Sequence, residues 1–442
     1  MKPPHLNDSE DVLLSILTYL DVASVVQCQR VSRHFQALAR SKQIWMFLVR
    51  DLDRRGLIDL PPPDVLSTYS AMQLVAEVKR IVVGPTTWLS HSDRQPTVRR
   101  QLHIPLGNYS LSPMLLPGGR HLLVERGLAC ELWDIAKSRR IWMRNGVSHG
   151  QVAVEYTCGK EELTFAIAMP MTIEIVRLNL HSNMQHVVAS YKLPSRFLQV
   201  SNTVIKGDFI ALAIDYQWIL LLNWKETKVA ILGLWGNFAN HSLHLISGHL
   251  VALTSTASAE VFLYPIAAFE SHWHPMTSKS LDAAARSSVN GGPFQPTVLR
   301  LAEYPRMEGR RPEQLFVHEC PLRHSSFVVS THSVCATTSG PYLHPSFHRF
   351  RLTISELTTP SRLHWRLLFS SDSVSAYEDF TYAGHGLSII SDVCMTQVVH
   401  RASTDGGVVP IPPQQRDTVS LSPYSGALCV CSHSGVDILY YE

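Results

Sequence analysis

Charged residues are scarce in this chain. Of its 442 residues only 17% are Asp, Glu, Lys or Arg, below the roughly 25% of an average globular protein. The 39 basic and 36 acidic residues leave a formal net charge of +3, and no long basic run occurs. The sequence therefore gives no electrostatic reason to expect a nucleic-acid partner. So little charge suits a strand-rich fold that buries much of its surface.

The sequence also lacks a membrane-spanning stretch and a cysteine framework. Its longest apolar stretch, residues 209–224, is interrupted by Asp215 and Gln217 and is shorter than the roughly 18 apolar residues that a spanning helix needs. The first residues turn acidic before any apolar run, so no secretory signal is expected. The eight cysteines are scattered and form no CxxC pair. We therefore expect no membrane partner, reduced thiols, and a location in the cytoplasm, the nucleus or both.

Motifs for catalysis and for cofactor binding are absent as well. No GxSxG elbow, P-loop or GxGxxG sequence occurs. The spacing of His272 and His274, and the group between His318 and His324, could suit zinc, but neither supplies two pairs of ligands. With 22 histidines in the chain, chance neighbours are expected. The sequence predicts no catalytic residue, no cofactor, no metal and therefore no enzyme.

What the chain does have is an unusually apolar N-terminal segment. Between Val12 and Leu48, 22 of 37 residues are apolar, against 45% in the whole chain. A unit of about 40 residues rarely buries so much by itself, and needs a disulfide, a metal or a partner to be stable. The excess predicts a surface that binds another protein.

Helix signals divide this segment. Residues 7–10 have capping-box spacing, and apolar residues then recur at one-turn intervals up to Leu20. Asp21 and Ser24 can cap a second helix. Ser32 begins a third, which we expect to continue through Leu48. Three short helices are predicted.

These residues resemble the F-box family over residues 6–48. The matching sequences are EDVLLSILTYLD at 10–21, RVSRHFQAL at 30–38 and IWMFL at 44–48. The resemblance implies binding to a Skp-type adaptor and, through it, to a cullin scaffold. Ser9 stands where the family usually has Pro, and Leu6 lies farther upstream than usual, which predicts weaker adaptor binding. The alternative is a three-helix cap that packs on its own chain.

The resemblance implies an apolar, adaptor-facing stripe on the first two helices. We expect it to comprise Leu6, Leu13, Ile16, Leu17, Val22, Val25 and Val26. Four later apolar residues fit a place in the internal core of the module as well as they fit an adaptor-facing surface, namely Val31, Phe35, Leu38 and Trp45. Spacing alone does not decide which of these side chains face outward, and no target-binding residue is predicted.

A stiff break and a further helix follow. Residues 60–63 read Leu-Pro-Pro-Pro, after which Asp64 can cap a helix with apolar residues up to Val78. We expect this linker helix to hold two domains at a fixed separation.

From Ile81 the apolar pattern alternates with a period of two, and a repeat emerges. LLPGGRHLLVERGLACELWDI begins at Leu115 and LSPYSGALCVCSHSGVDILYY at Leu421, each predicting a strand hairpin. The inner strands of these two hairpins start near Leu122 and Leu428. Five weaker copies bring the total to seven, and they start near Leu163, Phe209, Leu250, Phe327 and Leu387. Several of the intervals are near 40 residues, which is the spacing of propeller blades.

This region resembles the WD-repeat β-propellers. Leu132-Trp133-Asp134 is similar to their WD step, and Gly248-His249 and Gly384-His385 are similar to their Gly-His pair. The last copy stops one strand short of a blade. We expect the missing strand to come from residues 81–89 or 98–104, which would remove exposed sheet edges. A two-layer sandwich is the alternative architecture.

The predicted fold class is therefore α plus all-β and multidomain. Residues 1–52 form a three-helix F-box module, 53–80 a linker with a helix, and 81–442 a propeller of about seven four-stranded blades with an insertion near 265–315. The resemblances imply the substrate-recognition subunit of an SCF-type cullin-RING E3 ubiquitin ligase, whose propeller binds an unknown target protein. The alternative is a propeller hydrolase or lyase, or a scaffold that acts outside a ligase, capped by the N-terminal helices.

Overall fold

The computed structural model describes most of the chain. The described residues are 5–58, 63–84, 97–106, 111–147, 152–156, 162–169, 171–195, 197, 199–215, 217–233, 242–246, 248–254, 260–277, 279–283, 297–300, 310–336, 343–355, 362–371, 379–382, 387–391, 396–400, 408–410, 419–422, 424, 426–432 and 434–441.

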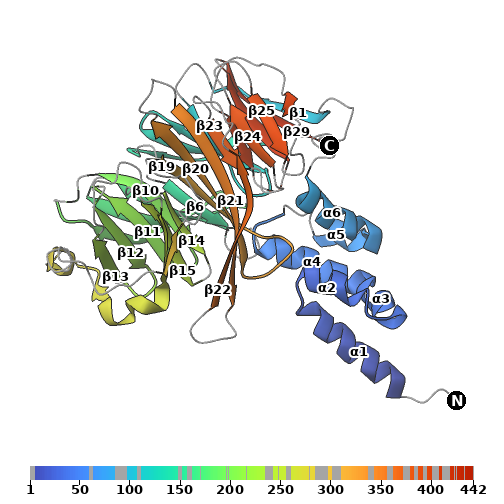
Figure 1. Cartoon of the computed structure of the whole chain (residues 1–442). Coiled ribbons are helices and arrows are strands. Elements are labelled where there is room, and N and C mark those ends of the chain that lie inside the picture. Colours follow the sequence, from blue (N-terminus) through green and yellow to red (C-terminus); the bar gives the residue numbers. More distant parts are fainter. Residues whose placement is uncertain are drawn as a thin grey trace.

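The N-terminal part is helical. It contains α1 (His5–Thr18), α2 (Val22–Cys28), α3 (Arg33–Ala39), α4 (Lys42–Arg54), α5 (Pro63–Thr68) and α6 (Ala71–Val83). Figure 1 shows these helices gathered at one side of the strand-rich part, with α1 farthest from it. In the described ranges none of the helices has the length and apolar character that crossing a bilayer requires.

Side-chain caps set most of the helix boundaries. Asp21 accepts a hydrogen bond from the Ser24 amide (2.7 Å) and Ser32 accepts one from the Phe35 amide (3.2 Å), which confirms the predicted starts of the second and third helices. The third helix is shorter than predicted. Ser41 caps a separate helix, α4, by accepting a bond from the Ile44 amide, because a serine hydroxyl competes with the helical carbonyl for this amide.

The predicted linker helix is divided in the same way. α5 ends at Thr68, and α6 starts behind a complete capping box formed by Ser70 and Gln73, whose two hydrogen bonds measure 2.7 and 3.3 Å. This Ser-x-x-Gln spacing is the sequence signal that the single-helix prediction overlooked.

The helices share one apolar core. Its centre is α4, where Ile44, Leu48 and Leu52 are fully buried. Leu74, Val78 and Ile81 of α6 pack against it. The Trp45 indole also donates a hydrogen bond to the Ala39 carbonyl (2.9 Å), which ties α4 to the end of α3. The linker helix α6 is therefore part of the helical core and no loose tether.

The strands of the described residues form seven antiparallel sheets. The first three, in chain order, are β2 (Leu111–Leu115), β3 (His121–Arg126), β4 (Ala129–Asp134) and β5 (Arg139–Asn145); β6 (Val152–Tyr156), β7 (Glu162–Met169), β8 (Thr172–Asn179) and β9 (Gln185–Lys192); and β10 (Val200–Lys206), β11 (Phe209–Ile214), β12 (Trp218–Asn223) and β13 (Lys228–Gly233), with β17 (His274–Pro275) as a fifth strand beside β13.

The next three sheets continue this order. They are β14 (Ser242–Ile246), β15 (His249–Thr254), β16 (Glu260–Pro265) and β18 (Thr297–Arg300); β19 (Arg310–Glu319), β20 (Ser326–Ala336), β21 (Leu343–Ser355) and β22 (Arg362–Ser371); and β23 (Asp379–Tyr382), β24 (Leu387–Ser391), β25 (Thr396–His400) and β26 (Val408–Pro410). The last sheet holds β27 (Val419–Ser422), β28 (Ala427–Ser432) and β29 (Gly435–Tyr441), completed by β1 (Val98–Ile104).

The sheets are arranged around a ring. The first strands of neighbouring sheets lie against each other, β6 beside β10, β10 beside β14, β14 beside β19 and β23 beside β27, and β27 lies beside β2 of the first sheet. Each of the seven repeat copies found in the sequence corresponds to the second strand of one sheet. The predicted fold class, helices followed by a propeller, is confirmed, and the sandwich alternative does not apply.

The strand before the first repeat completes the last blade. β1 pairs antiparallel with β29, from Val98 opposite Tyr441 to Ile104 opposite Val436. This confirms the second of the two segments proposed from the sequence for the missing strand. The pairing joins the two ends of the strand-rich region and covers a sheet edge that would otherwise be open.

The apolar cores lie between neighbouring sheets. Ile210, Leu212 and Leu220 pack with Ala166 and Ile175 of the preceding sheet. Side chains from both faces of β11 are buried, as are those of β12. This explains their nearly continuous apolar sequences, because a middle strand of a blade is covered on both faces.

The region predicted as an insertion contains regular elements. After β16 the chain forms the 3₁₀ helix η2 (Ile266–His272), β17 and a helical turn at 279–283, and then β18 and the start of β19. Leu281 in that turn is fully buried in the core between the second and third sheets. The boundaries at residues 52 and 80 and the limits of the insertion stay predictions.

Candidate functional site

The helical segment exposes apolar side chains along one side of α1. Val12 is 58% exposed, Ile16 53% and Tyr19, just beyond the helix end, 80%. Positions separated by four and three residues lie on the same side of a helix. Val26 at the end of α2 and Val31 after it are exposed as well. We call these five residues the apolar face.

Burial divides the seven residues predicted to face an adaptor. Leu17, Val22 and Val25 are at most 4% exposed and belong to the helical core, and Leu13 packs against that core while half-buried. Ile16 and Val26 are exposed. Leu6 lies in α1, but its side chain is outside the described residues. As an adaptor-binding set the seven stay a prediction.

The residues left open between core and surface divide too. Leu38 and Trp45 are buried and Phe35 is half-buried, whereas Val31 is 69% exposed. Val12, Tyr19 and Val31 were not named as binding residues from the sequence. The repeat of Val12, Ile16 and Tyr19 at helical spacing could have identified the α1 part, because it continues one side of that helix.

The helical segment is joined to the propeller by polar contacts. Arg55, directly after α4, donates from Nε to Glu319 Oε1 (2.8 Å) and from Nη2 to the Cys320 carbonyl (2.6 Å). Its Nη1 also contacts Asp51 Oδ2 on α4 (3.4 Å). Glu319 and Cys320 stand where β19 turns into β20. One guanidinium thus links α4 to this turn of the propeller.

A histidine and a carboxylate form a second contact at the same turn. His324 Nε2 lies 3.0 Å from Asp51 Oδ2. The hydrogen bond to Asp51 raises the pKa of His324 against the opposing effect of partial burial. Partial burial by itself would raise the pKa of Asp51, but the bonds and charges of His324 and Arg55 outweigh it and hold the pKa of Asp51 below its usual value.

Apolar and backbone contacts complete this junction. The Ala23 amide donates to the Leu322 carbonyl (2.9 Å), and Leu322 packs against the helical core. Tyr424, between β27 and β28, is 3% exposed within that core, and its hydroxyl donates to the Glu319 carbonyl. Two turns, one from the fifth sheet and one from the seventh, therefore hold the helices, and we call these contacts the junction.

The junction was not predicted from the sequence. Glu319 and His324 stood out only as part of a spacing that could suit zinc, and the structure instead pairs them with Arg55 and Asp51. In the described part of the chain no group of three or more His, Cys, Asp or Glu side chains is placed to hold a metal ion.

Comparison with known proteins identifies the helical part. Residues 10–51 match the family model described as F-box-like; this range runs from α1 into α4. Curated proteins give no match. The N-terminal helices thus contain an F-box-like module, and the strand-rich part is a propeller.

Two solved structures illustrate what the chain is similar to. One is the β-propeller domain of Cps50 (Swd1) from Myceliophteria thermophila, with 11% identity and a TM-score of 0.47, covering 78% of this chain and 99% of that one. Another is a chain of a mitotic checkpoint complex, with 11% identity and a TM-score of 0.45, covering 80% of this chain and 94% of that one. An F-box-like module joined to a propeller supports the role of an F-box substrate receptor.

Proposed function

We propose that this chain is the substrate-recognition subunit of an SCF-type cullin-RING E3 ubiquitin ligase. Its F-box-like module binds a Skp-type adaptor and, through it, a cullin scaffold, while the propeller binds the target protein. The observation that carries the proposal is the F-box-like match over residues 10–51, in a module that exposes an apolar face and is fixed to a propeller by the junction.

In this proposal the chain performs no chemistry itself. It holds a target lysine near a conjugating enzyme that the cullin brings to the complex, and so raises the effective concentration of the acceptor. Effective concentration is highest when the connection matches the distance between the two sites. A helical module held by Arg55 and by the buried ring of Tyr424 is suited to that task.

The exposed residues are the ones we propose to contact the adaptor. Val12 and Ile16 of α1 and Tyr19 just beyond its end, with Val26 and Val31, are the exposed apolar side chains that a partner can cover directly. Leu17, Val22 and Val25 belong to the helical core, so in this proposal they stabilise the module and do not contact the adaptor. Removing apolar surface from water contributes about 25 cal/mol per Å², so a few such side chains can dominate the binding energy.

The test uses two surface substitutions in the full chain. Ile16→Asp combined with Val26→Asp places two charges on the apolar face without entering the core, and the Skp-type adaptor and the cullin should no longer copurify. Met72→Asp is the matched control, because Met72 is 83% exposed on α6, outside the match. Unchanged adaptor capture by the double variant would overturn the proposal, provided that its thermal unfolding resembles that of the control.

Two further points belong to this proposal. Cys130, Cys320 and Cys429 are buried thiols that form no disulfide, and we propose action in the cytoplasm, the nucleus or both. The other readings of the sequence, a propeller hydrolase or lyase and a scaffold acting outside a ligase, are not favoured by the F-box-like match.

A further inference from the structure

The second sheet of the propeller ends in an edge that the described part of the chain does not cover. Its last strand, β9, pairs only with β8 among the described strands. In the third sheet the chain itself continues past the outer strand, because β17 pairs with β13, and four successive residues of β13 are buried. The edge of β9 instead presents backbone groups that another strand can bond.

Apolar side chains are exposed along the first half of β9. Met184, directly before the strand, is 70% exposed, Val187 53% and Val188 37%. No Asp, Glu, Lys or Arg occurs between His181 and Tyr191. This part of the edge is therefore both apolar and uncharged.

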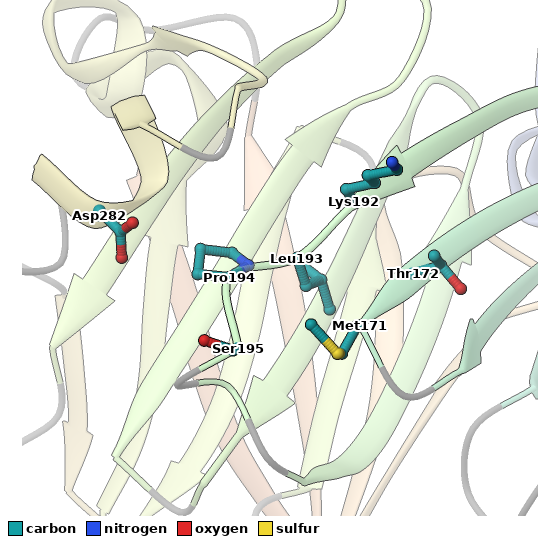
Figure 2. Close-up of a pocket in the computed structure, with 7 residues that line it drawn as sticks. All are labelled: Met171, Thr172, Lys192, Leu193, Pro194, Ser195 and Asp282. Atoms are coloured by element: carbon teal, nitrogen blue, oxygen red, sulfur yellow. The ribbon is translucent and has the colours of Figure 1, made fainter.

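The far end of β9 is held by the chain itself. The Leu193 amide donates to the Met171 carbonyl (2.8 Å). Figure 2 shows residues 192–195 and Asp282 around one pocket, which Asp282 reaches from the helical turn at 279–283. Leu281 of the same turn is fully buried between the second and third sheets. The accessible part of the edge is therefore the stretch 184–188.

Two other outer strands protect their edges with charge. Exposed arginines occur on β1, at Arg99 and Arg100, and on β5, at Arg139 and Arg140. All three strands contain a bulge in their pairing with the rest of the sheet. Charged side chains and bulges both hinder an edge from pairing with another chain. Of these three strands, β9 has the bulge without the charges.

The backbone of β9 directs alternate peptide groups outward. The Asn179 amide donates to the Met184 carbonyl (2.9 Å), so the groups of Met184 face β8. These directions alternate along a strand of an antiparallel sheet. The amide and carbonyl groups of Gln185 and Val187 therefore face away from β8, where an added antiparallel strand can bond them.

We propose that this edge binds the same edge of a second copy of the chain. The two β9 strands run antiparallel about a two-fold axis at His186, so that Gln185 of one copy lies opposite Val187 of the other. This register brings the outward-facing backbone groups together and places Met184 opposite Val188. A closed two-fold contact of this kind uses one patch twice.

Charge favours a second copy in this antiparallel arrangement. The centre of the contact contains no charged side chain that would repel its own copy. Lys192, the first charged residue after this stretch, lies at opposite ends of the contact in the two copies. A parallel pair in the same register would place the two Lys192 side chains next to each other, which is unfavourable.

This contact leaves the helical module free. The junction uses turns of the fifth and seventh sheets. In the ring, the third and fourth sheets separate the second sheet from the fifth, and the first sheet separates it from the seventh. The inference goes beyond the proposed function and holds with or without an adaptor. In a ligase, two copies would bind a target that carries two recognition segments more tightly than one copy does.

The first test measures the molar mass of the full chain by sedimentation velocity. We expect the dimer fraction to rise between about 1 and 100 µM, and Val187→Lys to weaken dimerisation at least about tenfold, because it places two lysines in one contact. Met143→Lys is the matched control, since Met143 is 40% exposed on the outer strand β5. Ile16→Asp combined with Val26→Asp should leave the dimer intact, which separates this contact from association through the apolar face.

The second test uses a disulfide to probe the register. The groups of His186 face β8, so on the open side His186 forms a non-hydrogen-bonded pair with itself across the axis. The Cα atoms of such a pair are about 4.5 Å apart, within the range that a disulfide spans. His186→Cys should therefore give a covalent dimer on mild oxidation, and Met143→Cys should not.

Four results would overturn the inference. The first is a monomer at every concentration, which leaves the edge to a strand of a different protein. The others are unchanged dimerisation in Val187→Lys, loss of the dimer in the Ile16→Asp and Val26→Asp double variant, and equal cross-linking of the two cysteine variants. Adaptor capture is measured separately, and its absence would contradict the proposed function without affecting the contact at β9.

Discussion

Arg55 and Glu319 are 264 residues apart in sequence, and their side chains meet at 2.8 Å. The Arg55 side chain is only 13% exposed and makes its strongest contacts to the propeller, to Glu319 and to the Cys320 carbonyl. An ion pair with this degree of burial is screened by water less than a surface pair. The guanidinium also forms a planar fork that can bind several acceptors at once. This residue is therefore the main polar connection between the helical module and the propeller.

Replacing Arg55 should loosen the junction more than it destabilises either part. Arg55→Met keeps much of the side-chain volume but leaves Glu319 without its partner, at a cost of about 2 kcal/mol. Amide hydrogen exchange should accelerate in α4 and in the turn between β19 and β20. Arg55→Lys should give an intermediate result, since a lysine keeps the charge but cannot bridge both acceptors in the same geometry.

The neighbouring Arg54 provides the control for this prediction. It contacts Asp51 at 3.4 Å, but its side chain is 55% exposed, so Arg54→Met should cost at most about 0.5 kcal/mol. If the two methionine variants exchange equally fast at the junction, Arg55 has no special role there.

Tyr424 should contribute mainly through packing. Tyr424→Phe removes the hydroxyl that donates to the Glu319 carbonyl and should cost about 1 kcal/mol. Tyr424→Ala also leaves a hole in the helical core and should cost about 3 to 5 kcal/mol. Chemical denaturation of the full chain compares the two, and similar losses for both variants would contradict the predominance of packing.

The sequence predicts local features of this fold well. The helix starts at Asp21 and Ser32 depend on hydrogen bonds within one turn. A closing strand was expected because the last repeat lacked one, but the sequence left two segments open for it, 81–89 and 98–104, and the structure has the second. What depends on distant packing was not predictable. Leu17 and Ile16 are adjacent and equally apolar, but only Leu17 is buried, because the positions of the other helices decide which side of α1 is covered. The contact of Arg55 with Glu319 leaves no local pattern at all.

The contact between His324 and Asp51 should make the junction sensitive to pH. The pKa of His324 is raised above its usual 6.5. The stabilisation that the protonated imidazole gives to the junction is therefore fully present below pH 6.5 and is lost as the pH rises through the raised pKa. The pKa of Asp51 is lowered below its usual 3.8, so its contribution is present above pH 3.8 and is lost as the pH falls through the lowered value. Between pH 3.8 and pH 6.5 the stabilisation from the charged Asp51 and that from the protonated His324 are both present.

Hydrogen exchange at α4, followed across pH, measures this effect. The wild type should be better protected than His324→Asn below pH 6.5, and the difference should fade at higher pH. Because the His324 side chain is 45% exposed, we expect a difference below about 1 kcal/mol. His186→Asn, at an exposed histidine of β9, should match the wild type throughout. A constant difference between wild type and His324→Asn at all pH values would rule out the ionic contribution.

The closing strand of the propeller depends on a glycine. Gly435 begins β29 with a φ of +153°, and a Cβ at this position would lie 2.1 Å from the Ile104 carbonyl oxygen at the end of β1. Gly435→Ala must therefore displace the backbone of β1.

Gly127 provides the control for this prediction. It also has a positive φ, of +59°, but open space surrounds it, so Gly127→Ala should show the conformational strain alone, about 1 to 2 kcal/mol. We expect Gly435→Ala to cost about 1 to 3 kcal/mol more and to speed amide exchange throughout β1, because the strain acts where that strand completes the last blade. Equal losses of thermal stability in the two variants, with β1 still protected, would show that close packing at Gly435 is not needed to join the ends of the ring.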